Sequence, residues 1–173
     1  REEVSPRWAG NQYQPIVYRS AQPRAAVITG AEVVKSWQPY QGDTWVVTLP
    51  NSFFGSYNPY ATLISGDWLD MGIPCHTGEV FLNDKSLYEQ DSLEKVLQPV
   101  ENDASWDIAF TKHTWYTTQS EDGESTLIYA NFQGKNPNEE NVEITVRPHC
   151  FYPEQEHVNY ITLTGFVVTK AAT

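Results

Sequence analysis

The sequence predicts an all-β fold, an antiparallel β-sandwich with one short helix. Three observations support it. Short runs rich in Val, Ile, Thr, Tyr and Trp follow one another along the chain, clusters of Gly, Asn and Asp separate them, and only one segment carries helix signals. Many short strands at this spacing are typical of a sandwich.

The strand-like runs share period-2 alternation or β-branched enrichment. They are residues 14–20, 25–29, 31–37, 44–49, 79–82, 86–88, 108–118, 125–131, 142–146 and 160–169. Two hairpins stand out: Asp122-Gly123 joins runs 108–118 and 125–131, and Asn83-Asp84 joins runs 79–82 and 86–88.

One helix is expected at residues 92–98. Asp91 can cap it, Glu94 can cap reciprocally, and Pro99 ends it. Trp37, Trp45, Trp106 and Trp115 fall in or beside strand-like runs and are predicted to lie in the core.

Composition excludes several classes of protein. The 173 residues carry a net charge of −11, which argues against nucleic-acid binding through phosphates. No metal-ligand spacing is present, and neither a metal nor a cofactor is expected. Cys75 and Cys150 are compatible with one disulfide or with two free buried thiols, so they favour neither a cytoplasmic nor a secreted protein. Of the four histidines only His76, in an aromatic loop, merits attention.

That loop covers residues 51–78 and follows no strand or helix period. Long loops of this kind are usually functional. Aromatic rings stack on the apolar faces of sugars, so its aromatic residues are candidate sugar contacts. On physics alone Trp68 favours core packing, and Tyr57 and Tyr60 are evenly divided between loop packing and pocket lining.

The C-terminal run 159–168 alternates, bends at Gly165-Phe166 and resumes, as one rung of a parallel β-helix does. A lone rung cannot bury its inner face, because such coils need stacked neighbours. An ordinary last strand of the sandwich is the alternative.

Several longer strings of residues are distinctive when they are taken together. They are Leu49-Pro50-Asn51-Ser52-Phe53-Phe54-Gly55, Tyr57-Asn58-Pro59-Tyr60, Gly66-Asp67-Trp68-Leu69, Gly78-Glu79-Val80-Phe81-Leu82-Asn83, Tyr129-Ala130-Asn131-Phe132-Gln133-Gly134, Pro137-Asn138-Glu139, Cys150-Phe151-Tyr152-Pro153, Asn159-Tyr160-Ile161-Thr162 and Ala171-Ala172-Thr173. Through these strings the chain resembles, over nearly its whole length, the β-xylosidases of glycoside hydrolase family 120.

The resemblance implies an immunoglobulin-like β-sandwich inserted into a right-handed parallel β-helix that carries the chemistry. Residues 1–15 would then be the tail of an early rung, 16–157 the sandwich, and 158–173 a truncated rung. The catalytic carboxylates would lie on the missing β-helix, so we expect this chain alone to be inactive.

The same resemblance implies that Trp68 lines a pocket for the non-reducing xylose, with Asp67 beside it and Tyr57 and Tyr60 as weaker candidates. The expected partners are xylo-oligosaccharides, bound weakly or not at all by the isolated domain, the missing β-helix, and further subunits of a homo-oligomer in bacterial xylan degradation. No nucleic acid or membrane is expected. Two alternatives remain: a stand-alone carbohydrate-binding module and a structural immunoglobulin-like module.

Overall fold

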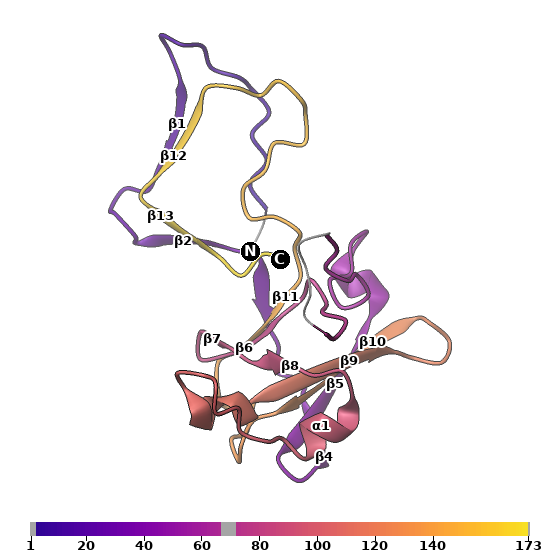
Figure 1. The fold of residues 1–173 in the computed structure, drawn as a ribbon. Helices are drawn as coiled ribbons and strands as arrows, with labels where there is room; N and C mark the ends of the chain where they lie inside the picture. The colour runs from indigo at the N-terminus through magenta and orange to yellow at the C-terminus, as the bar shows by residue number, and fades with distance from the viewer. Residues whose placement is uncertain (1–2, 67–71, 173) are drawn as a thin grey trace.

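The computed structural model describes residues 3–66 and 72–172 and divides into two parts (Figure 1). A sandwich of two sheets forms the body, and an arm built from both ends of the chain extends from it. The predicted all-β sandwich is confirmed. No helix within the described ranges is long and apolar enough to cross a membrane.

The first sheet has the strand order β4-β5-β10-β9-β8. Its members are β4 (Gln38–Gln41), β5 (Thr44–Pro50), β10 (Ser125–Asn131), β9 (Thr114–Gln119) and β8 (Tyr88–Glu89). All neighbours are antiparallel except β8 and β9, which are parallel. The predicted turn at Asp122-Gly123 joins β9 and β10, and Gly123 takes the positive φ of 72° that glycine tolerates.

The second sheet is antiparallel, with the order β3-β11-β6-β7. Its members are β3 (Ala31–Val33), β11 (Val142–Thr145), β6 (Val80–Leu82) and β7 (Lys85–Ser86). Asn83 and Asp84 form the predicted turn between β6 and β7, both with positive φ. The run 79–88 therefore forms a hairpin and then crosses to the first sheet as β8.

The core lies between the two sheets. Its largest fully buried side chains are Trp37, Trp115, Tyr60, Phe132 and Ile128. Two of the predicted core tryptophans are thus confirmed, and Trp45 packs partly buried against the same cluster. The prediction for Trp106 is wrong: its side chain is fully exposed, because residues 103–107 form turns and not a strand.

The helical segments differ in detail from expectation. α1 (Leu93–Leu97) lies where a helix was predicted, but Ser92 is its N-cap residue and makes no side-chain capping bond. Asp91 pairs instead with Lys95, four residues on. The start of the predicted strand 108–118 is the 3₁₀ helix η2 (Ile108–Lys112), and a second 3₁₀ helix, η1 (Asn51–Phe54), follows β5.

The arm consists of two parallel strand pairs. β1 (Ile16–Arg19) pairs with β12 (Ile161–Thr164), and β2 (Ala26–Thr29) pairs with β13 (Phe166–Thr169). The run 160–169 is therefore two strands, bent at Gly165 with φ 78° as its sequence indicated. β1 and β2 fall within the range 16–157 expected for the sandwich, and they pair with strands of the C-terminal segment.

A buried ion pair connects arm and sandwich. Lys170 directly follows β13, and its Nζ donates to Glu143 of β11 and to Asp84 in the β6–β7 turn. The Lys170 and Glu143 side chains are 7% and 6% exposed, whereas Asp84 is open to solvent. This charge pair, which is shielded from water, joins the arm to the sandwich together with backbone hydrogen bonds such as that from Ala172 N–H to the Arg147 carbonyl.

Candidate functional site

The residues expected to contact sugar divide into two groups. Asp67 and Trp68 lie outside the described residues. Tyr57 and Tyr60 are described, and the segments on either side of Asp67 and Trp68 are joined by backbone hydrogen bonds: Ile64 N–H donates to the Cys75 carbonyl over 2.8 Å. The residues that flank the candidate sugar-binding segment are therefore held next to each other.

Tyr60 is a core residue, 1% exposed. Its ring packs against Phe54 and edge-on against Trp115, and its hydroxyl donates to the Glu79 carbonyl over 2.6 Å. Burial raises the pKa of this phenol well above its ordinary value. Of the two interpretations left open by the sequence, this geometry supports packing.

Tyr57 is half-buried, and its hydroxyl lies 2.6 Å from the Thr77 hydroxyl. Thr77 in turn donates from its backbone N–H to the Thr62 carbonyl and from its hydroxyl toward the Pro59 carbonyl. The hydrogen bond between Tyr57 and Thr77 therefore joins the beginning of the 51–78 loop to its end, and it lies within the loop.

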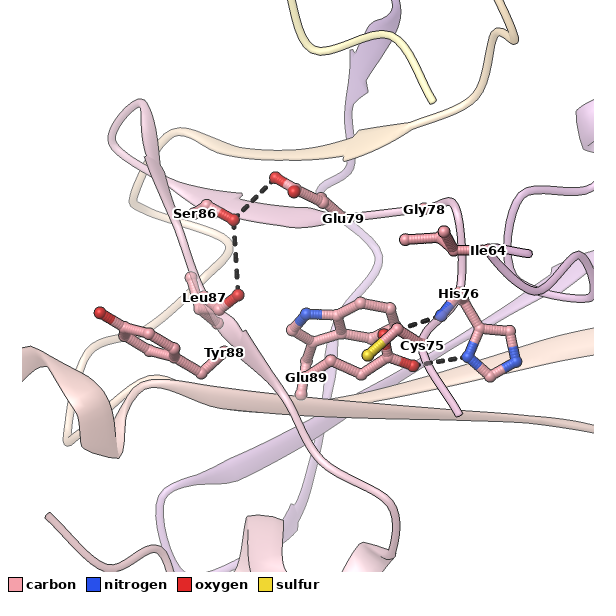
Figure 2. A pocket seen from close by; sticks show the side chains of 10 residues that line it. Ile64, Cys75, His76, Gly78, Glu79, Ser86, Leu87, Tyr88 and Glu89 are labelled. Carbon is pink, nitrogen blue, oxygen red and sulfur yellow. Dashed lines mark hydrogen bonds and ion pairs between the residues drawn. The ribbon is translucent and has the colours of Figure 1, made fainter. Parts of the chain in front are cut away.

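A cavity of about 440 Å³ opens beside this loop (Figure 2). Its walls come from residues 75–79 on one side and from the β7–β8 segment on the other. The apolar lining is Ile64, Leu87 and the indole of Trp115, and carboxylates or hydroxyls complete it at Glu79, Ser86, Tyr88 and Glu89. An apolar surface with a few oriented polar groups is the usual composition of a small-molecule site.

His76 and Glu89 are joined by two hydrogen bonds at one wall of the cavity. Glu89 accepts from the backbone N–H of His76 over 2.9 Å, and its other oxygen lies 2.5 Å from His76 Nδ1. Sequence reasoning singled out His76 but missed Glu89, thirteen residues away. No local signal indicated this pair. Glu89 lies opposite Trp115 in the parallel β8–β9 pairing, and the His76 ring lies 6.4 Å from the Trp115 ring.

The other carboxylate, Glu79, is held separately. It accepts from the Ser86 hydroxyl over 2.7 Å, and Figure 2 shows it directed toward Ser86, away from the His76–Glu89 pair. Burial raises the pKa of the Cys75 thiol, which disfavours the reactive thiolate form. Among residues 3–66 and 72–172, no group of three or more His, Cys, Asp or Glu side chains is placed to hold a metal ion.

The two cysteines do not pair. Cys75 and Cys150 are both free and buried, the second of the two states left open by the sequence. Burial also raises the pKa of Cys150, whose Sγ lies 3.2 Å from the Thr169 carbonyl at the root of the arm.

Comparison with known proteins gives one family and one related structure. No curated protein matches the chain. A solved structure described as the complex of XylC with xylose is 41% identical, with a TM-score of 0.89 over the whole of this chain. The chain spans 29% of the length of that protein. Residues 34–144, which contain most of the sandwich core, match the family described as glycoside hydrolase 120, insertion domain, and the chain belongs to that family.

Proposed function

We propose that this chain is the non-catalytic inserted domain of a β-xylosidase-like glycoside hydrolase, where it helps to complete a pocket for xylose or xylo-oligosaccharides and packs against the catalytic body. One observation carries the proposal: the chain is 41% identical, along its full length, to part of a protein solved with xylose. The insertion-domain family supports the same assignment.

The carboxylates of the cavity fit binding better than hydrolysis. A retaining glycosidase needs two carboxyl groups about 5–5.5 Å apart, one as nucleophile and one as acid/base. Here Glu89 is committed to both the ring and the backbone of His76, and Glu79 to Ser86. Carboxylates held in this way are suited to accept hydrogen bonds from sugar hydroxyls.

The arm supports packing against a larger β body. Parallel sheets are normally covered on both faces, and an isolated two-stranded sheet is marginal in water. Yet β1–β12 and β2–β13 are two-stranded, and Val17, Val27 and Val168 are each about half exposed. Stacked rungs of a parallel coil, the catalytic body implied by the family, would cover these side chains.

The test compares two polypeptides. The 173-residue chain alone should release no nitrophenol from 4-nitrophenyl β-xyloside. In a polypeptide that joins this chain to its catalytic body, Trp68→Ala should raise KM for that substrate about tenfold, because a stacking surface is lost, and Trp68→Phe should restore part of the affinity.

Turnover by the 173-residue chain would place the chemistry inside it and refute the proposal. Unchanged KM in the Trp68→Ala polypeptide would refute the pocket role.

A further inference from the structure

Residues 62–64 and 75–77 form a short antiparallel pair, here called the stem of the 51–78 loop. Two backbone hydrogen bonds of 2.8 and 2.9 Å join its two halves, on either side of the facing residues Leu63 and His76. A strand pair this short is marginally stable in water by itself. Contacts from outside the stem must therefore hold it in place.

The backbone N–H of His76 is directed away from Leu63. In an antiparallel pair, a residue that lies between the two backbone bonds points its own N–H outward. Glu89 of β8 accepts this N–H over 2.9 Å, and its second carboxylate oxygen lies 2.5 Å from His76 Nδ1. Figure 2 shows both bonds. One side chain of the first sheet thus binds the outer edge of the stem at two points.

Water competes little for these two bonds, because the His76 and Glu89 side chains are only 21% and 11% exposed. Hydrogen bonds to a carboxylate are roughly twice as strong as those between neutral groups. Within the described part of the chain, these two are the hydrogen bonds that join the stem to the sheets. The other hydrogen bonds of the stem stay inside the 51–78 loop.

We propose that Glu89 is a positioning residue: by binding His76 it fixes the stem to the first sheet, and so fixes both ends of the segment that follows and precedes the stem. That segment is residues 65–74 in the sequence and includes Trp68. The effect of this position on sugar binding rests on the proposed function. The attachment of the stem does not, because it depends on bonds within this chain.

The first experiment measures amide hydrogen exchange by NMR in the 173-residue chain. Glu89→Ala removes both bonds, so the N–H groups of Ile64 and Thr77 should exchange at least about tenfold faster. Glu89→Gln keeps one carbonyl oxygen, so its effect should be smaller. The rates at both sites should not depend on urea below the unfolding transition, as expected for local opening.

Glu79→Gln is the matched control, because Glu79 lines the same cavity but its carboxylate accepts from Ser86. It should leave exchange at Ile64 and Thr77 unchanged. Unchanged exchange in Glu89→Ala would overturn the proposal. Equal acceleration in Glu79→Gln, or a steep urea dependence at these sites, would overturn it as well, since the effect would then come from cavity charge or from global unfolding.

The His76 ring gives a spectroscopic signature of the same contact. A carboxylate only accepts hydrogen bonds, so the neutral ring must carry its proton on Nδ1. Nitrogen NMR spectra should show this tautomer in the unsubstituted chain and in Glu79→Gln, and its loss in Glu89→Ala. The same tautomer in Glu89→Ala would contradict the pairing.

The second experiment uses the polypeptide that joins this chain to its catalytic body. Glu89→Ala should raise KM for 4-nitrophenyl β-xyloside about fivefold and leave kcat unchanged, and Glu89→Gln should restore part of the affinity. His76→Phe removes the Nδ1 bond, and its combination with Glu89→Ala should cost no more than Glu89→Ala alone. Additive losses would mean that Glu89 acts independently of His76, and they would overturn the positioning role.

Failure here is distinguishable from failure of the proposed function. If Trp68→Ala raises KM and Glu89→Ala does not, the positioning role is overturned and the pocket role stands. If neither variant raises KM, the proposed pocket role fails, and hydrogen exchange in the 173-residue chain still decides whether Glu89 holds the stem.

Discussion

Replacement of Lys170 by methionine tests whether the buried ion pair holds the arm to the sandwich. Methionine keeps most of the side-chain volume and removes the charge. The Glu143 carboxylate, 6% exposed, then loses the cation that its Oε2 contacts. The amide of Asn141, 3.3 Å from the same oxygen, remains.

The expected cost follows from this burial. Removing one partner of a buried ion pair typically costs about 3–5 kcal/mol, because the other charge is left in a poorly solvated site. The remaining amide and other contacts of Glu143 reduce this, so we expect a loss of about 2–3 kcal/mol in the free energy of unfolding. For a chain of this length, that lowers Tm by roughly 5–10 °C.

The assay is urea denaturation followed by tryptophan fluorescence, with Lys95→Met as control. Lys95 pairs with Asp91 at the surface, where water and salt screen the charges, so Lys95→Met should change the free energy of unfolding far less than Lys170→Met. Glu143→Gln and the variant that combines it with Lys170→Met complete a double-mutant cycle. A loss below about 0.5 kcal/mol for Lys170→Met, or no coupling to Glu143, would refute the reasoning.

The pH dependence of the same pair has a defined sign. Burial opposes the charged form of Lys170, but the hydrogen bonds and charges of Asp84 and Glu143 outweigh it, so the pKa of Lys170 is raised above its usual value. Its contribution to stability is therefore complete below the unfolded pKa of 10.5 and is lost as pH rises through the higher folded pKa. Lys170→Met should remove this alkaline loss, as measured by Tm from pH 8 upward.

Three further outcomes are expected. Tyr60→Phe should cost about 1–2 kcal/mol in urea denaturation, because a buried carbonyl loses its donor; no change would mean that water replaces the hydroxyl. Gly30→Ala should lower the free energy of unfolding by about 2–3 kcal/mol, since the added Cβ would lie 2.5 Å from a backbone atom of Ala171. Gly42→Ala places its Cβ in open space and should cost only about 1 kcal/mol, because of the positive φ. Equal losses for the two variants would contradict the packing described. Burial lowers the pKa of His113, so stability should fall as pH drops below 6.5, and a Tm profile of His113→Phe should lack this component; an identical profile would contradict it.

Local patterns predicted much of the sandwich. The β9–β10 hairpin followed from alternation and an Asp-Gly turn, and Trp37 and Trp115 from their place in β-rich runs. The prediction that Trp106 lies in the core was wrong because it relied on the aromatic side chain and the nearby strand-like run, and not on the polar neighbours of Trp106. Its polar context, Ser105 before it and Asp107 after it, is a turn signal that could have corrected the prediction.

The amino-acid sequence by itself determined the fold class, the turns, the short helix and, through its strings of residues, the family. These depend on contacts close in the chain, where residue type restricts backbone geometry directly. Only the tertiary structure decided the His76–Glu89 pair, the Lys170–Glu143 pair and the parallel pairing of β1 with β12. Each of these contacts joins residues far apart in the sequence, and no pattern of neighbouring residues predicts it. These contacts therefore depend on how the two sheets and the arm pack.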